Sequence, residues 1–334
     1  MSIKLSYSKK QVRKAGECLI NKHQSMPTDE ALLILNNWRL CHAYPLNSVQ
    51  NSLRYRAKLI DDKAVVTQRL KRISSIKNKL IRFDYMKLDT MQDIGGCRVI
   101  LPNNNNVYQV KEEIINTKSI NIIKEVDYIL NPKVTGYRGI HLISQYCGKN
   151  LDFKDLKIEI QIRNKMQHYW ATAVEIIDTF TGQHLKSGEE ENEWHEFFKL
   201  VGLSMGKIEN EIEIENSDKE KIKQLNEKLE VTGKLLHYRN LINWTENIGK
   251  VKGIFLLILN PKINEIKIVH FRNSELVEAT EEYARLEKET QNENIDIVLI
   301  KTDSIEEIKK GYPNYFADSE NFIEILFSIL DMKE

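Results

Sequence analysis

The stretch that decides the fold is Ile158-Glu159-Ile160-Gln161-Ile162-Arg163. Apolar and polar residues alternate strictly along it, which predicts a β-strand with one buried face. Glu159, Gln161 and Arg163 then lie side by side on the other face. A carboxylate, an amide and a guanidinium in that arrangement suit the binding of phosphate and metal, and a solvent-exposed sheet edge is the alternative interpretation.

A second predicted strand supplies another carboxylate. This strand covers Cys97–Leu101 and is entered through Asp93-Ile94-Gly95-Gly96. Carboxylate oxygens are the protein ligands that magnesium prefers. The two strands therefore predict one Mg²⁺ ion held between Asp93 and Glu159.

Composition limits the class of protein. The 334 residues carry a net charge of +1, which excludes a uniformly basic surface that coats nucleic acid. The four cysteines form no C-x-x-C pair, so neither a zinc knuckle nor a disulfide framework is expected. No apolar run has the length of a signal peptide or a membrane span, which predicts a reduced, cytoplasmic protein.

The expected fold class is α+β, with a mixed β-sheet flanked by helices. The first 85 residues are expected to be helical, with one helix covering 63–83. The pattern then changes to short β-rich runs at 97–101, 120–129, 137–146 and 156–163, and it returns to a helical period from Asn164.

Four segments are expected along the chain. They are an N-terminal helical region (1–48), a core (49–185), a helical linker or extension (186–248) and an accessory α+β domain (249–334). In the last segment, two apolar runs joined by Asn260-Pro261-Lys262 predict a β-hairpin. A helix, a strand and two short helices follow it, which gives a small ββαβα-like domain.

A basic run suggests a binding site for phosphates. Between Arg54 and Arg82 there are ten Lys or Arg residues against two acids, Asp61 and Asp62. A triphosphate bound without a P-loop needs such a cluster, and no G-x-x-x-x-G-K-[ST] motif is present. The alternative is an ordinary solvent-exposed helix face.

The segment Asn131–His141 suggests a site for a nucleobase. Its Pro and Gly residues predict a turn that leads into a strand, on which Tyr137, Gly139 and His141 share one face. An aromatic ring on that face can stack on a base, and the glycine leaves room for it. The alternative is a Tyr and a His that cap the edge of a sheet.

Four motifs in order resemble the synthetase domain of the RelA/SpoT family, over roughly residues 50–180. They read R-x-K…S-I…K, D-I-x-G-x-R-V, N-P-K-x-x-G-Y-R-x-I-H and x-E-I-Q-I-R. Enzymes of this family move pyrophosphate from ATP to a ribose 3′-hydroxyl. The resemblance implies a nucleotidyltransferase-like sheet and Mg²⁺ as cofactor.

The resemblance also implies a role for each matching residue. Asp93 and Glu159 bind the metal, and Glu159 also draws the proton from the attacking hydroxyl. The ATP-binding residues are Arg69, Lys71, Lys79 and Arg98, with the two arginines on either side of the adenine. The acceptor-binding residues are Lys133, Tyr137, His141 and His168, while Gln161 and Arg163 support the site. Gly139 stands where most family members have Ser, which puts the fine geometry of the acceptor in doubt.

The function expected from the resemblance is synthesis of (p)ppGpp-type alarmones from ATP and GDP or GTP. One alternative is a toxin-type enzyme that modifies the 3′ end of tRNA, for which the basic run would bind RNA. Another is a partner-regulated switch, in which residues 249–334 act as a sensor or autoinhibitor or as a contact with a protein partner. A homo-oligomer is compatible with each of these.

Overall fold

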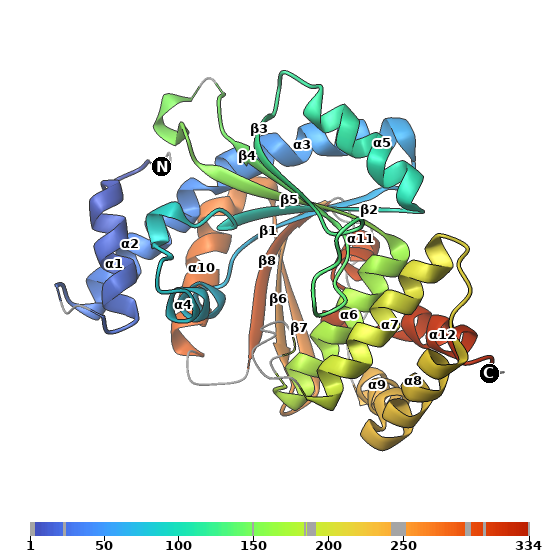
Figure 1. Ribbon diagram of the computed structural model, residues 1–334. Coiled ribbons are helices and arrows are strands. Elements are labelled where there is room, and N and C mark those ends of the chain that lie inside the picture. Colours follow the sequence, from blue (N-terminus) through green and yellow to red (C-terminus); the bar gives the residue numbers. More distant parts are fainter. Residues whose placement is uncertain are drawn as a thin grey trace.

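The computed structural model describes residues 4–22, 25–148, 150–183, 185, 192–241, 252–290, 295–302 and 305–332, and there the chain forms an eight-stranded mixed sheet with helices on both faces (Figure 1). The strand order is β3-β4-β5-β2-β1-β8-β6-β7. The strands are β1 (Val65–Leu70), β2 (Gly95–Leu101), β3 (Asn121–Asp127), β4 (Ile140–Gln145), β5 (Lys157–Asn164), β6 (Gly253–Asn260), β7 (Glu265–Phe271) and β8 (Asp296–Thr302). The expected α+β class with a mixed sheet is confirmed.

Strand β5 shows why the alternating stretch folds as it does. Ile158, Ile160 and Ile162 are completely buried, and together with the neighbouring strands they pack against helices α3 (Ala43–Ile60) and α5 (Asn104–Ile115). The strand is parallel to β2 and antiparallel to β4. The polar residues of β5 therefore face the opposite side of the sheet.

A second group of helices packs on that opposite side. It contains α6 (Lys165–Thr181), α7 (Glu193–Glu209), α8 (Asn216–Leu229), α9 (Val231–Leu241), α11 (Ile305–Gly311) and α12 (Glu320–Ile329), and the short helix η4 (Pro313–Phe316) follows α11. An apolar core that includes Phe197, Phe255 and Phe322 joins these helices to the C-terminal strands. No helix in the described part of the chain is both long and apolar enough to span a membrane.

The N-terminal region is helical, but one expected helix is wrong in its first half. Helices α1 (Lys9–Leu19), α2 (Thr28–Cys41) and α4 (Ile73–Arg82) share an apolar core beside the sheet. The helix expected over 63–83 contains only α4, because 65–70 form β1. Val65, Val66 and Thr67 are β-branched, and β1 pairs with β2 along its whole length, so tertiary pairing overrides the helical reading.

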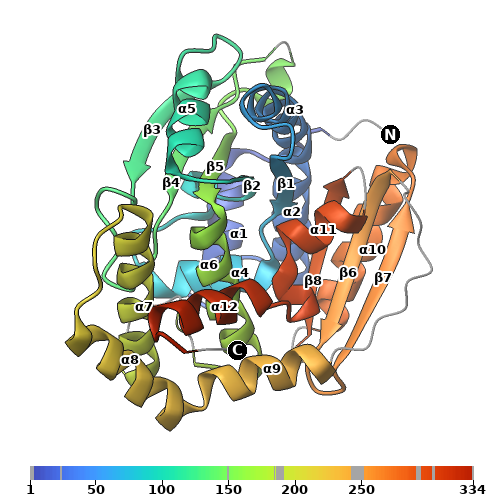
Figure 2. The ribbon, with the colours of Figure 1, turned by 90° about the vertical axis from the view of Figure 1, so that its right-hand side faces the viewer.

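The C-terminal residues extend the same sheet. Strands β6 and β7 form the expected hairpin, and α10 (Leu276–Glu289), β8 and α11 follow in the expected order (Figure 2). Strand β8 has one registered pair with β1, Arg69 with Ile300, whereas β1 and β2 share six. The pairing between β1 and β8, which links the two parts of the sheet, is therefore short. The expected boundary at 248–249 lies outside the described residues.

Candidate active site

One face of the sheet gathers side chains that the sequence singled out, because registered residues on paired strands point to the same side. Gly96 of β2 lies opposite Glu159 of β5, and Arg98 lies opposite Gln161. Gln161 in turn lies opposite His141 of β4. Acidic, amide and cationic side chains from three strands therefore meet on this face.

Five predicted side chains form a closed ring of hydrogen bonds, here named the Glu159 ring. Gln161 Nε2 donates to Glu159 Oε2 at 2.8 Å, and Arg163 Nη2 donates to Gln161 Oε1 at 2.9 Å. Arg163 Nε donates to the Tyr137 hydroxyl at 3.1 Å, and this hydroxyl lies 2.5 Å from His141 Nε2. His141 Nδ1 closes the ring at Glu159 Oε1, 3.1 Å away. The ring holds the Glu159 carboxylate in one orientation.

The ring also determines the charge of Glu159. Burial alone would raise the pKa of Glu159, but His141, the hydrogen bond from Gln161 and the charge of Lys71 outweigh burial and hold the pKa well below its ordinary range. A carboxylate can only accept, so His141 Nδ1 is the donor to Glu159. In a neutral His141, Nε2 then accepts from the Tyr137 hydroxyl.

Asp93 forms a second charged cluster, in the turn that leads into β2. Its Oδ2 accepts from Lys71 Nζ and from Lys79 Nζ, each at 2.9 Å. Burial would raise the pKa of Asp93, but the two lysines outweigh burial and the nearby Glu159, so the pKa is lowered. Burial also lowers the pKa of Lys71, although Asp93 opposes this change. Glu159 lies close enough to Asp93 for its negative charge to raise the pKa of Asp93.

Asp93 has the better geometry for a metal ligand. Its Oδ1 is buried and has no hydrogen-bond partner, so it is an oxygen donor ready for a cation. Both oxygens of Glu159 are already bonded within the Glu159 ring. Within the part of the chain that the structure describes, no three His, Cys, Asp or Glu residues form a metal-binding group. The residues present therefore fit a Mg²⁺ ion that takes one ligand from Asp93 and the others from substrate phosphates and water.

The loop of residues 128–139, which connects β3 to β4, brings Lys133 to the same place. Its ammonium lies 4.6 Å from the ring centre of Tyr128 and 5.0 Å from that of Tyr137. Burial lowers the pKa of Lys133, which Glu159 partly offsets. Gly139 has φ +147°, and a Cβ there would lie 3.1 Å from Arg163 Cγ, so a side chain at this position would strain the backbone and crowd the ring.

The part of the sequence that carries this geometry matches a known protein family. Residues 68–177 match the family model described as "Region found in RelA / SpoT proteins". We name residues 68–177 the RelA/SpoT region after this match. The resemblance read from the four motifs is thereby confirmed for this third of the chain.

Known proteins show the same similarity. GTP pyrophosphokinase YjbM of Bacillus subtilis is 34% identical over 110 residues, which are 32% of this chain and 52% of that protein. GTP pyrophosphokinase YwaC of the same organism is 36% identical over 112 residues, or 31% and 52%. The chain thus spans about half the length of these curated relatives.

Two solved structures from Bacillus subtilis also show similarity to this chain. The small alarmone synthetase 1, bound to its product pppGpp, is 24% identical with a TM-score of 0.44, over 50% of this chain and 89% of that one. The small alarmone synthetase 2 is 23% identical with a TM-score of 0.45, over 52% and 94%.

All twelve predicted site residues lie in the RelA/SpoT region, but residues from outside it cover the two arginines. Arg98 Nη1 donates to the backbone carbonyl of Gly311 at 3.1 Å, and its guanidinium lies 5.8 Å from the ring centre of Tyr312. Burial, with the charge of Arg163, lowers the pKa of Arg98 to about 10. Burial also lowers the pKa of Arg69, but Glu175, Tyr312 and nearby phenols outweigh it, so that pKa is raised.

His168 belongs to this covered part of the RelA/SpoT region. Its Nε2 donates to the backbone carbonyl of Lys310 at 2.9 Å, and its Nδ1 is buried without a hydrogen-bond partner. Burial, with the charges of Arg98 and Arg163, lowers the pKa of His168 to about 3. The structure therefore places His168 against the C-terminal segment.

Several residues at the site were missed from the sequence. Arg138 lies inside the Tyr-Arg-Gly motif, which was a usable signal, and it pairs with Glu209 beyond the RelA/SpoT region. Gly311 and Tyr312 carry no motif that links them to Arg98. They reach the site only because the C-terminal strands extend the sheet.

Proposed function

We propose that this chain is a pyrophosphokinase that transfers the β,γ-pyrophosphate of ATP to the 3′-hydroxyl of GDP or GTP, which yields (p)ppGpp-type alarmones. The proposal rests on one observation, the closeness of two carboxylates. Glu159, held in its ring, is near enough to raise the pKa of Asp93, and Asp93 has one buried oxygen without a hydrogen-bond partner beside two lysines. The relatives YjbM and YwaC are named GTP pyrophosphokinases, which supports the same reaction.

In the proposed reaction, the 3′-oxygen forms a bond to the β-phosphorus of ATP. The bond between that phosphorus and the α–β bridging oxygen breaks, and AMP leaves with the bridging oxygen. Glu159 accepts the proton of the hydroxyl. Its low pKa keeps it ionised at neutral pH, and general-base assistance of this kind contributes about 10²–10⁴-fold.

The charges of the phosphates need compensation during this transfer. Asp93 would hold Mg²⁺ through Oδ1, and the ion, when bound, would neutralise phosphate charge and polarise the phosphorus. Lys71 and Lys79 would release Asp93 and bind phosphate oxygens instead, since ammonium groups form strong charge-assisted hydrogen bonds to phosphate. The barrier is then lowered mainly by positioning and electrostatics.

The two bases would lie at opposite ends of the site. Arg69 and Arg98 would hold the adenine of ATP. Tyr137 would stack on the acceptor base, while Lys133 and His141 would contact the acceptor phosphates, and Gln161 with Arg163 would keep Glu159 and Tyr137 in place. His168 is not assigned to the acceptor, because it is buried against the Lys310 carbonyl.

An isotope-transfer assay tests the reaction. The full chain is incubated with Mg²⁺, γ-labelled ATP and, in parallel, GDP, GTP, ATP or total tRNA. Label on GDP or GTP is the expected result. Label on tRNA alone would replace the proposal by the toxin-type reaction, and label on none of the four would refute it.

As a second candidate function, we propose self-inhibition by the C-terminal segment. The specific observation is that Gly311 and Tyr312 contact Arg98, which the first proposal assigns to adenine. A Cβ on Gly311 would clash with Thr67 Cγ2, so only glycine allows this close approach to β1. In this arrangement ATP cannot reach Arg98 until the segment moves.

Polar contacts hold the segment in place. Arg72 pairs with Asp296 of β8, which also accepts from the Tyr315 hydroxyl at 2.8 Å. Arg39 pairs with Glu287 of α10 at 2.6 Å. Together with the single β1–β8 pair, these contacts hold the segment over Arg98.

Substitutions in the full chain test the self-inhibition. Gly311→Val introduces a clash with Thr67, and Tyr312→Ala removes the ring beside Arg98, so both are expected to raise kcat/KM for ATP by tenfold or more. Glu306→Ala, on the exposed side of α11, is the matched control. Unchanged ATP kinetics in both variants would refute the proposal.

A further inference from the structure

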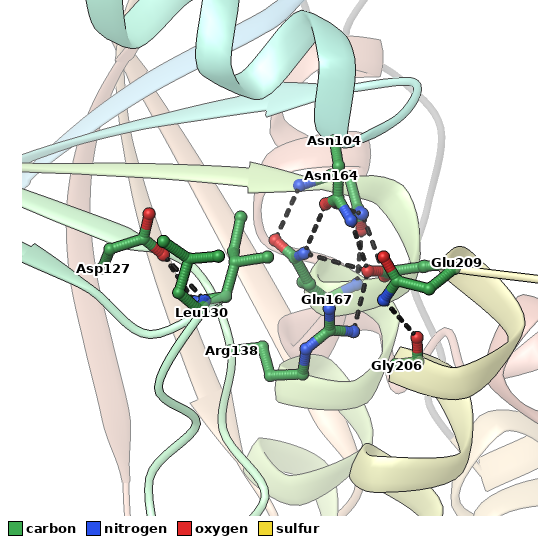
Figure 3. Close-up of polar contacts among 10 residues, drawn as sticks. Asn104, Asp127, Leu130, Arg138, Asn164, Gln167, Gly206 and Glu209 are labelled. Atoms are coloured by element: carbon green, nitrogen blue, oxygen red, sulfur yellow. Dashed lines mark hydrogen bonds and ion pairs between the residues drawn. The ribbon is translucent and has the colours of Figure 1, made fainter. Parts of the chain in front are cut away.

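A buried polar cluster lies behind the 128–139 loop, here named the acceptor loop, and its central carboxylate comes from outside the RelA/SpoT region (Figure 3). Glu209, the last residue of α7, pairs with Arg138 Nη1 at 2.7 Å, and their side chains are only 7% and 5% exposed. Three amides also donate to Glu209: Asn104 and Asn164 at 2.9 Å each, and Gln167 at 3.3 Å. One carboxylate thus binds donors from α5, β5, α6 and the acceptor loop.

The cluster itself is tightly connected. Asn164 and Gln167 form the capping box that begins α6, and both donate to the Asn104 side-chain oxygen, at 2.8 and 2.9 Å. The three amides around Glu209 therefore hold one another in place. An ion pair that is buried among so many donors is costly to break, because the remaining charge stays without a partner.

The other end of the acceptor loop is held as well. Asp127 Oδ1 accepts from the backbone N–H groups of Ile129 and Leu130, at 2.8 and 3.0 Å, and Figure 3 shows Asp127 beside Leu130. Tyr108 of α5 donates to Asp127 Oδ2 at 3.1 Å. Between the two anchors the loop is open to solvent, with Val134 82% exposed. The anchors therefore determine where the loop directs its site residues.

The anchor at Arg138 acts directly on Tyr137. The Tyr137 hydroxyl bonds to Arg163 and His141 in the Glu159 ring, whereas the next side chain, Arg138, pairs with Glu209. Tyr137 and Arg138 are joined by one planar peptide unit. Holding Arg138 on one side therefore sets the direction in which Tyr137 projects on the other.

Helix α7 also supports the loop through its backbone. Gly136 has φ +87°, and a Cβ there would lie 2.8 Å from the Cα of Lys199. A Cβ on Gly202 would lie 2.5 Å from the Gly136 carbonyl oxygen. Two glycines thus allow α7 and the loop to touch one residue before Tyr137.

We propose that Glu209 is a positioning residue for the acceptor nucleotide: through Arg138 it fixes the acceptor loop, so that Tyr137 and Lys133 meet the base and phosphates of a guanosine nucleotide. This inference rests on the proposed function. It assigns α7 to the acceptor half of the site and predicts that the ATP half does not depend on Glu209.

The test compares Glu209→Ala and Glu209→Gln with the wild-type full chain. At saturating ATP, Glu209→Ala is expected to lower kcat/KM for GDP by roughly ten- to a hundredfold, as small displacements of positioned groups do. Glu209→Gln keeps part of the hydrogen bonding, so its kcat/KM for GDP is expected to lie between those of the wild type and Glu209→Ala. KM for ATP is expected to stay within about twofold in both variants. Glu196→Ala is the matched control on the same helix, since Glu196 forms a half-exposed pair with Lys221.

A second readout needs no substrate. The amides of Lys133 and Gly136 donate to Tyr137 O and Lys133 O within the loop, and their hydrogen exchange is expected to quicken in both Glu209 variants. Where Glu209→Ala fails to fold, Glu209→Gln and Gly202→Ala, which pushes on the Gly136 carbonyl, provide the test. Unchanged exchange, or an equal loss for GDP and ATP, would overturn the inference. Absence of any labelled GDP or GTP in the wild type would instead refute the proposed function, and the exchange would still decide whether Glu209 anchors the loop.

Discussion

Arg98 donates a hydrogen bond to the carbonyl of Gly311, so a residue of the RelA/SpoT region is bound by a residue from the far end of the chain. The contact is buried and includes the ring of Tyr312. A nucleotide base and this segment cannot occupy the same side of Arg98 at once. If Arg98 holds the adenine as proposed, linkage requires that ATP binds more weakly to the covered form than to an uncovered one.

Hydrogen exchange measures this competition. A saturating non-hydrolysable ATP analogue is expected to increase exchange at the Tyr312 and Tyr315 amides, which donate to Ile308 O and Tyr312 O in the covered form. GDP alone is expected to leave these amides unchanged, because its proposed site is at Tyr137. If the ATP analogue protects them instead, the segment closes over ATP and does not compete with it.

Asp93→Asn removes the negative charge that the metal and both lysines need. Turnover is expected to fall by about a thousandfold or more, since electrostatic stabilisation of the transition state usually contributes more than any other effect in such a reaction. Steady-state kinetics with GDP and circular dichroism separate lost catalysis from lost folding. Asp155→Asn, in a turn with φ +70° that Asn tolerates, is the matched control. Near-normal turnover in Asp93→Asn would show that the site is misplaced.

Tyr137→Phe opens the Glu159 ring while it keeps the aromatic face. Arg163 loses its acceptor and His141 loses a partner, so Glu159 is held less firmly. We expect kcat to fall by about tenfold while KM for GDP changes little, because stacking remains. Tyr137→Ala is expected to raise KM for GDP as well. If the two variants behave alike in both parameters, the hydroxyl has no separate role.

Glu287→Ala removes the carboxylate that pairs with the buried Arg39 guanidinium, which keeps only neutral partners such as the Lys71 carbonyl. The two side chains are 3% and 7% exposed, and Glu287 also accepts from the Ile73 amide at 2.9 Å. The free energy of unfolding is expected to fall by about 3–5 kcal/mol, measured by urea denaturation. Glu289→Ala on the same helix breaks a half-exposed pair with Arg285 and is expected to change stability little. A smaller loss of unfolding free energy in Glu287→Ala, together with higher activity, would mean that the C-terminal segment separates from Arg98 before the protein unfolds.

Two buried histidines make stability depend on pH. Burial lowers the pKa of His42 to about 4, with a backbone hydrogen bond to Trp38 opposing it, and lowers that of His168 to about 3. An unfolded histidine titrates near pH 6.5, so below that pH the unfolded chain binds more protons than the folded one. Each histidine should therefore remove up to about 1.4 kcal/mol of stability per pH unit as pH falls from about 6.5 to about 4.5. His42→Gln should reduce the slope of unfolding free energy against pH, whereas His237→Gln, on the exposed side of α9, should not.

The sequence was a reliable guide wherever one strand or one turn decides the outcome. The alternation in 158–163 places three isoleucines in the core and Glu159, Gln161 and Arg163 on the other face, because side chains of a strand alternate whatever lies around it. The hairpin at 260–262 and the turn before Tyr137 were equally local. The predicted 63–83 helix was wrong because β1 gains its stability from pairing with β2, and helical propensity contains no information about strand pairing.

From the sequence alone came the α+β class and the resemblance to RelA/SpoT proteins, since periodicity and motif order are properties of neighbouring residues. Only the tertiary structure showed that Gly311 lies on Arg98, that Glu209 holds Arg138, and that one oxygen of Asp93 is without a partner. These relationships join residues far apart in the chain. They depend on which strands pair and how closely two backbones approach, and no local pattern encodes either.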